Sequence, residues 1–454
     1  MAESKIPYGP TYREMLDPVE MPKNVRERAL QAAGGNELDP VNLFNITWKD
    51  QAGQVRSLVL PPEITGVDAN IVVLLGVGFP SGSHKVGPAY AILMEGCVDG
   101  EIIPGRHTIM APSTGNFGIG LAYVGALTGC RTVVIMPEGA SRERHQRIKK
   151  YGAELELLSG EQANLFYALQ RTRDLKKDPV NRPLSQFELF ANYRFHRYVT
   201  GNSAIEAVRG TGNGRIACFV SAPGSGGTIA AGDEVKKAFP EARVAAVEPY
   251  ECPTLAVGGR GLHRVEGIGD EIVTLVHNLI NTDFVVLVCD EDCVRGLKVF
   301  RDGAAVLEKR GVAAETAGRM RDAFGVSGVC NLLGAIKMAK YLRLGPGDNV
   351  VTVATDGIDR YHSVIGELEK RCLEINHSVM DRWLNDIFSR AGEDHIYDFR
   401  RPGAKQTLFE QKEKDWLPFG YTREYLEEMK SQEFWDHEYS LVTDYDQKIK
   451  TMRG

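Results

Sequence analysis

A lysine at position 85 stands in a glycine-rich stretch just before an apolar run, an unusual setting for a charged side chain. Gly82 and Gly87 flank it, and residues 89–94 are almost all apolar. This context predicts a buried amine at the start of a helix. Burial lowers the pKa of a lysine, so that its neutral form can act as nucleophile and base near neutral pH. Lys85 is therefore the candidate catalytic residue.

Two loops rich in glycine and hydroxyl groups follow predicted strands. The carboxylate loop consists of Ser113, Thr114, Gly115 and Asn116. The phosphate loop consists of Gly224, Ser225, Gly226, Gly227 and Thr228. Free amide groups in such loops, together with the start of the following helix, attract anions. An amine, a carboxylate site and a phosphate site together indicate pyridoxal 5'-phosphate as the cofactor.

Each of these features also has a purely structural explanation. Ser113 or Thr114 could cap the helix that follows them. The phosphate loop could be a tight turn without a ligand, and Lys85 could be a solvated residue at a turn. A dinucleotide site is a further alternative, but neither residues 76–78 nor residues 210–214 complete G-x-G-x-x-G at the start of a helix.

Composition limits the class of protein. The chain has 454 residues, 43% hydrophobic and 25% charged, which is enough for two hydrophobic cores. The net charge of -6 gives no basic surface for nucleic acid or for anionic membranes. No signal peptide and no apolar run of membrane-spanning length stand out, so we expect a cytoplasmic protein. The eight cysteines form no C-x-x-C pair, so we expect no disulfide framework and no metal site.

Strand and helix patterns alternate along the chain. Apolar runs without alternation predict strands buried on both faces at residues 71–76, 108–112, 132–137 and 216–221. Helical patterns occupy residues 118–127, 141–151, 228–238 and 294–301. This order predicts an α/β fold with two parallel-sheet domains. Because both loops follow strands, the cofactor is expected in the cleft between these domains.

The expected organisation has four parts. They are an N-terminal extension (1–60), a first α/β domain with Lys85 and the carboxylate loop (61–214), a second α/β domain with the phosphate loop (215–373) and a C-terminal extension (374–454). The last part holds three of the four tryptophans, which disordered tails lack. Helical spacing recurs at residues 379–387, behind a possible cap at Ser378, and at residues 421–429. We therefore expect helices that pack on the body or on a partner.

The chain resembles the fold type II pyridoxal phosphate enzymes, specifically the cysteine synthase and cystathionine β-synthase branch. The resemblance runs from about Leu74 to Ser363. Seven segments carry it in the family's order: 112–118, 136–142, 186–201, the phosphate loop, 265–269, 326–328 and 355–361. Departures occur at His84, at Phe117 and in the long stretch 303–325. These departures affect residues near the expected substrate pocket, so the resemblance does not identify the substrate.

The resemblance implies roles for individual residues. Lys85 would form the Schiff base, and the phosphate loop would hold the cofactor phosphate. The substrate carboxylate would meet Ser113, Thr114, Gly115, Asn116 and Gln186, and Asn116 would also touch the cofactor. Thr355 would face the pyridine nitrogen, although the adjacent Asp356 is an alternative. His84 resembles the histidine beside the phosphate in the tryptophan synthase β chain. Members of the family usually form homodimers.

The function implied is β-replacement on a small β-substituted L-amino acid through an aminoacrylate intermediate. An O-activated serine and sulfide, or another thiol, would be the cysteine synthase-like substrates. The nearest alternative is β-elimination by a lyase or dehydratase, which gives a 2-oxo acid and ammonia. A catalytically silent scaffold that acts through its C-terminal helices is a remote alternative.

Overall fold

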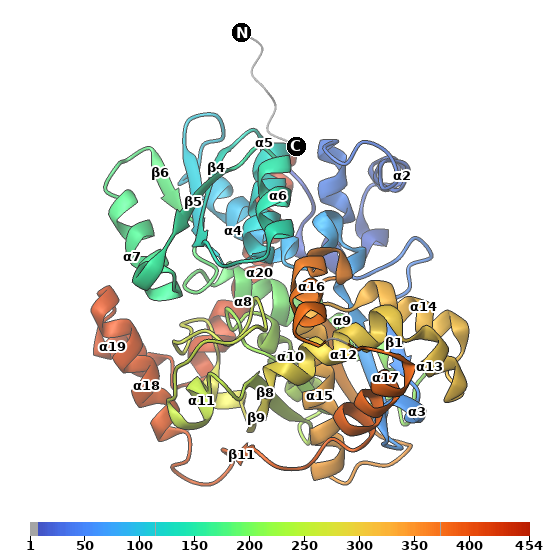
Figure 1. Ribbon diagram of the computed structural model, residues 1–454. Coiled ribbons are helices and arrows are strands. Elements are labelled where there is room, and N and C mark those ends of the chain that lie inside the picture. The colour runs from blue at the N-terminus through green and yellow to red at the C-terminus, as the bar shows by residue number, and fades with distance from the viewer. Residues whose placement is uncertain (1–7, 114, 373) are drawn as a thin grey trace.

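The computed structural model describes residues 8–113, 115–372 and 374–454, and within them the chain forms two sheets surrounded by helices (Figure 1). The larger sheet has seven strands in the spatial order β1 (Ser57–Leu60), β2 (Asn70–Leu75), β10 (Asn349–Ala354), β7 (Ile216–Ser221), β8 (Arg243–Pro249), β9 (Phe284–Val288) and β11 (Ile396–Asp398). The smaller has four, β5 (Glu154–Leu158), β4 (Arg131–Pro137), β3 (Thr108–Pro112) and β6 (Asn181–Pro183). The predicted α/β class with parallel sheets is confirmed.

The central strands run parallel, and the two antiparallel strand pairs of the described sheets, β1 with β2 and β9 with β11, lie at the edges of the larger sheet. Every residue of β9 and of β10 is buried. Their apolar sequences without alternation reflect this position, since helices cover both faces of a parallel sheet. The four strands that the sequence predicts are present as β2, β3, β4 and β7.

Helices of the first half of the chain surround the smaller sheet and the junction with the larger one. They are α4 (Val86–Val98), α5 (Asn116–Thr128), α6 (Arg142–Lys150), α7 (Leu165–Leu175), α8 (Ala191–Phe195) and α9 (Gly201–Ala207), with a π-helical turn, η6 (His196–Thr200), between the last two. α4 packs against both α5 and α8. The start of α4 and the start of α5 therefore face one region of the molecule.

Helices of the second half cover the larger sheet. They are α10 (Ala231–Ala238), α11 (Thr254–Val257), α12 (Asp290–Asp302), α13 (Ala304–Lys309), α14 (Ala314–Ala323), α15 (Val326–Tyr341) and α16 (His362–Arg371). α15 crosses β7, β8, β9 and β10. The long stretch 303–325 is filled by α13 and α14, so this departure from the family adds helices rather than a loop.

Sheet order differs from chain order at one important place. β2 lies in the stretch assigned to the first domain, yet it pairs with β10 of the larger sheet over six residues. The smaller sheet begins only at β3. Hydrophobic pattern identifies a buried strand but not its neighbours, which is why this pairing was not foreseen. The division of the chain into domains stays a prediction.

The N-terminal region contributes α1 (Tyr12–Leu16), α2 (Lys23–Ala32) and α3 (Pro62–Thr65). The C-terminal region forms α17 (His377–Trp383), the π-helical turn η10 (Leu384–Ser389), α18 (Gln406–Trp416), α19 (Arg423–Glu428) and α20 (Gln432–Arg453). The predicted helical extension is confirmed, and Figure 1 shows α18 and α19 along one flank of the body. The expected cap at Ser378 is wrong: the Asn376 side chain accepts the amide of Val379 and caps α17. Among the described residues no helix combines the length and apolarity needed to cross a bilayer.

Candidate active site

Lys85 lies at the N-cap of α4, where the chain turns after β2. It is 8% exposed. Ser81 adopts a left-handed backbone (φ 62°), and Ser83 forms an isolated bridge with Asp356 just beyond β10. These features fix the turn against the carboxyl end of the larger sheet. The predicted burial of the amine at a helix start is therefore present in the structure.

The Lys85 amine points toward the phosphate loop. Its Nζ donates a hydrogen bond to Ser225 Oγ over 3.2 Å. Burial lowers the pKa of the Lys85 amine to about 8, and the nearby carboxylate of Asp270 opposes that shift. The neutral amine is consequently accessible at mildly alkaline pH, as nucleophilic chemistry requires.

The phosphate loop joins β7 to the short 3-10 turn η7 (Thr228–Ala230) that leads into α10. Gly226 has a left-handed backbone (φ 80°), and a side chain at Gly227 would collide with Asn192. Within the described chain, the amides of Ser225 and Gly226 donate to no protein acceptor. Unpaired amides at a glycine turn before a helix are what a phosphate group needs.

The carboxylate loop connects β3 to α5. Ser113 Oγ accepts the amides of Gly115 (3.1 Å) and Gly118 (2.9 Å), so this serine caps the turn, as the structural alternative proposed. Thr114 lies outside the described residues. Asn116 donates from Nδ2 to Asp356 (2.6 Å), while its buried Oδ1 has no partner. A side chain at Gly115 would approach Arg144 Cδ to 2.6 Å, so only glycine fits here.

One cavity brings most of the predicted site residues together. Its lining includes Lys85, Ser113, Gly115, Asn116, Gln186, Gly224, Ser225, Thr228 and Thr355. Gly226, Gly227 and His84 are not part of this lining. The cavity lies between elements of the two sheets, so residues 85–116 and residues 224–228 meet although more than a hundred positions separate them.

His84 lies behind the phosphate loop. Its Nε2 is 3.2 Å from Thr228 Oγ1, and its ring stacks on Trp48 with centroids 5.4 Å apart. Burial, and then the charge of Lys85, lowers the pKa of His84 well below its usual value. The ring is therefore neutral and can orient the Thr228 hydroxyl through a hydrogen bond.

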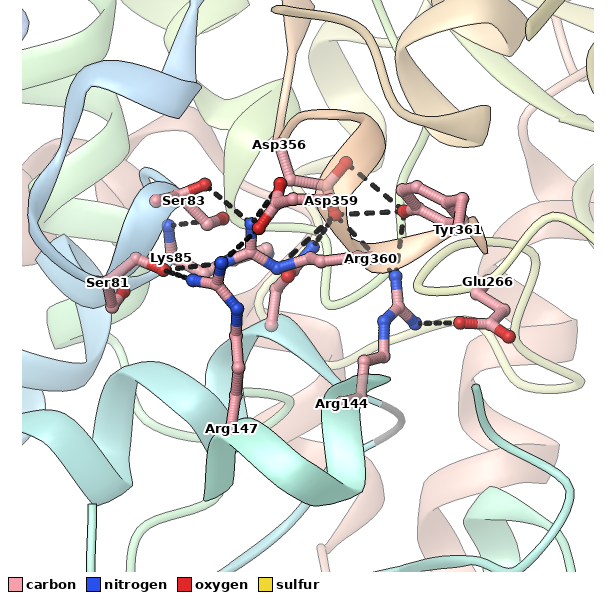
Figure 2. A network of polar contacts seen from close by, with 12 residues as sticks. Ser81, Ser83, Lys85, Arg144, Arg147, Glu266, Asp356, Asp359, Arg360 and Tyr361 are labelled. Carbon is pink, nitrogen blue, oxygen red and sulfur yellow. Dashed lines mark hydrogen bonds and ion pairs between the residues drawn. The ribbon is translucent and has the colours of Figure 1, made fainter. Parts of the chain in front are cut away.

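Thr355 and its neighbour Asp356 have different surroundings. Thr355 lines the cavity. Asp356 is fully buried and accepts hydrogen bonds from the Tyr361 hydroxyl (2.9 Å) and from Asn116. Figure 2 shows Asp356 within a network that also contains Arg144, which pairs with Glu266 over 2.7 Å. Asp356 is thus engaged in a polar network, and Thr355 is the residue open to the cavity.

Sequence reasoning missed Asp270, which lines the same cavity. It comes directly after the segment 265–269 that contributed to the resemblance. Asn192, which lies in the segment 186–201 of that resemblance and was assigned no role, donates from Nδ2 to Ser225 Oγ (2.9 Å) and to the Gln186 carbonyl (2.7 Å). The one sequence feature that could have indicated Asp270 is its position directly after the segment that contains Gly267 and Gly269, where an acidic residue follows two glycines.

The residues present fit a phosphate-bearing aldehyde cofactor, because a buried amine and a glycine turn with unpaired amides open on one cavity. A family model described as pyridoxal-phosphate dependent enzyme matches residues 63–356. The chain belongs to the pyridoxal-phosphate dependent enzymes. Within them it is a fold type II enzyme of the cysteine synthase branch.

Named relatives of this pyridoxal-phosphate family agree in sequence and fold. A cysteine synthase from Staphylococcus aureus is 34% identical over 296 residues, which are 65% of this chain and 88% of the relative. The solved O-acetyl serine sulfhydrylase isoform 3 from Entamoeba histolytica superposes with a TM-score of 0.62 at 25% identity, over 81% of this chain and 97% of that one. A hydrogen sulfide-producing enzyme from Fusobacterium nucleatum superposes with a TM-score of 0.58 at 27% identity, over 69% and 88%.

Proposed function

We propose that this enzyme performs β-replacement on a small β-substituted L-amino acid, with an O-activated serine as the donor and sulfide or another thiol as the acceptor. The observation that carries the proposal is the Lys85 amine, 3.2 Å from the phosphate loop in a cavity that the carboxylate loop also lines. Relatives that are named cysteine synthases support the same chemistry.

Pyridoxal phosphate supplies an electron sink that stabilises negative charge at the substrate α-carbon. Lys85 holds the cofactor and then moves the proton at that carbon. The backbone amides and hydroxyls of the phosphate loop would hold the phosphate, with the Thr228 hydroxyl oriented by His84. Thr355, which lines the cavity and carries a neutral hydroxyl, would be the partner of the pyridine nitrogen.

The substrate carboxylate binds at the start of α5. Asn116 supplies a helix N-terminal backbone amide, and the side-chain amide of Gln186, which lines the same cavity, supplies an N–H donor. Thr114 and Ser113 complete the proposed carboxylate site. A carboxylate bound here would fix the substrate α-carbon near Lys85, which lines the same cavity, and so position the proton for transfer.

Holoenzyme incubated with O-acetylserine and sulfide is expected to form cysteine. Borohydride reduction followed by peptide mass spectrometry is expected to place the cofactor on Lys85. Lys85→Ala should abolish both signals, whereas Lys177→Ala, which removes an exposed lysine, should change neither. Pyruvate in place of cysteine would favour the β-elimination alternative, and a protein that binds no cofactor would favour the scaffold alternative.

The same proposal includes a homodimer in the cytoplasm. The dimer follows from the family resemblance. All eight cysteines are free, which suits a reducing compartment. Sedimentation of the purified holoenzyme at twice the chain mass is the expected result.

A further inference from the structure

Asp270 is a carboxylate in the cavity that has no part in the roles assigned above. It lies in the long connection between β8 and β9, and its backbone oxygen accepts the Thr254 hydroxyl over 3.0 Å. The preceding Gly269 has a left-handed backbone (φ 69°) packed on Pro249. The backbone is thus held, while the carboxylate faces the cavity and, among the described residues, interacts electrostatically with Lys85 and Glu271 without a hydrogen bond.

The charges around Asp270 are few. Burial raises the pKa of Asp270 to about 7, the positive charge of Lys85 counteracts this, and the neighbouring Glu271 reinforces it. Near neutral pH both the acid and its conjugate base are then populated. A group with that balance can give a proton and later take one, which is the requirement for general acid–base catalysis.

Replacement at the β-carbon needs such a second group. Lys85 takes the α-proton and must keep it until the α-carbon receives it back. A sulfur or hydroxyl substituent leaves the β-carbon far more readily when it acquires a proton, because free thiols have a pKa of about 8.5 and water one of about 15.7. The carboxylate of an O-acyl group, derived from an acid of pKa near 4, leaves without one.

We propose that Asp270 is the general acid–base catalyst for the β-substituent, and that the site accepts thiol- and hydroxyl-substituted amino acids as well as O-acyl ones. As the bond from the β-carbon to sulfur or oxygen breaks, its electron pair goes to the departing atom and the Asp270 carboxyl supplies the proton. When a neutral thiol adds, sulfur bonds to the β-carbon and the Asp270 carboxylate takes the thiol proton. With a thiol or hydroxyl leaving group, Asp270 ends the cycle as it began; with an O-acyl group, which leaves without a proton, Asp270 passes the thiol proton to solvent. This assignment rests on the proposed β-replacement.

The test compares two substrates that differ in their need for a proton. Single-turnover loss of the β-substituent is followed by cofactor absorbance with O-acetylserine and with S-methylcysteine. Asp270→Asn is expected to slow the reaction of S-methylcysteine about 100-fold or more, within the usual range for a general acid. The rate with O-acetylserine should change by less than about threefold.

Glu271→Gln is the matched control, since it removes one negative charge beside the cavity without touching its lining. It should leave both rates within about threefold of the wild type. Equal slowing of both substrates by Asp270→Asn would assign Asp270 an effect on Lys85 or on folding and overturn the proposal. Unchanged rates, or a wild type that uses only O-acetylserine, would also overturn it. A wild type that uses neither substrate would overturn the proposed function together with this assignment.

Discussion

At the scale of single residues, the chemistry depends on how burial changes the protonation of Lys85. Its pKa of about 8 in the folded protein lies well below the ordinary lysine value of about 10.4. The charged form is therefore disfavoured, and the neutral amine that attacks an aldehyde predominates above about pH 8 instead of above pH 10. The folded protein provides a ready nucleophile.

Cofactor uptake by the apoprotein should reflect this shift. The rate of Schiff base formation is expected to rise with pH and to level off above a midpoint near 8, because only the neutral amine reacts. Stopped-flow absorbance after mixing apoprotein with pyridoxal phosphate measures it. A midpoint near pH 10 would show that Lys85 is solvated.

The sequence could predict those site residues whose signal is local. Lys85, the carboxylate loop and the phosphate loop each stand out through glycine and hydroxyl residues next to a strand. Asp270 has only a weak local signal, an acidic residue after two glycines, and the contact between Asn116 and Asp356 has none. That contact joins positions 240 residues apart, so it depends on tertiary packing.

At the scale of elements, α6 follows a strand of the smaller sheet and contacts segments that belong to the second half of the chain, which forms most of the larger sheet. Arg144 of α6 pairs with Glu266, donates to the Tyr361 hydroxyl (2.8 Å) and lies 3.6 Å from Asp356 (Figure 2). Glu143, also on α6, accepts the amide of Ser363 (2.9 Å). This helix therefore holds the two sides of the cavity together.

Arg144→Gln should lower the free energy of unfolding by roughly 3 kcal/mol, because it removes the buried cation that pairs with Glu266 and leaves Asp356 with only the more distant Arg360. Urea denaturation of the holoenzyme measures this change. Arg142→Gln alters an exposed arginine on the same helix and should stay within about 0.5 kcal/mol. Equal values for the two variants would mean that the ion pairs of α6 contribute little.

The C-terminal helices illustrate how far periodicity predicts structure. Helical spacing and tryptophan content correctly indicated packed helices, but not their partners. Trp435 of α20 is fully buried against Tyr193 of α8, with ring centroids 4.9 Å apart, and its Nε1 donates to the Met429 carbonyl. The sequence pattern shows that a helix such as α20 has an apolar face, but it does not show which residues of the folded protein pack against that face.

Trp435→Ala should destabilise the protein by about 3–5 kcal/mol through loss of this buried side chain. Met452→Ala, on the same helix but 46% exposed, should cost less than about 0.5 kcal/mol. Calorimetry on both variants gives the comparison. A small effect of Trp435→Ala would show that α20 is only loosely attached.

At the scale of the whole molecule, the first and the last described helices, α1 and α20, pack against each other. α20 contacts α1 as well as α4 and α8. Arg453 donates two hydrogen bonds of 2.7 Å to the Glu14 carboxylate, which is itself buried and caps α1 together with Thr11. Burial alone would raise the pKa of Glu14, but the bonds from Arg453 and Thr11 bring it below the usual value. The first and last described helices are thereby joined across the fold.

A double-mutant cycle on Glu14 and Arg453 measures that connection. Arg453→Met should cost about 2 kcal/mol, less than the roughly 3–5 kcal/mol of a fully buried pair, because the Arg453 side chain keeps 24% of its exposure. Glu14→Gln in the Arg453→Met background should then cost about 1 kcal/mol less than it does alone, since the carboxylate has already lost its partner. The lowered pKa of Glu14 means that this stabilisation is present above about pH 4 and declines as the pH falls further, when the carboxylate becomes protonated. Additive costs at pH 7 would show that α1 and α20 lie together without stabilising each other.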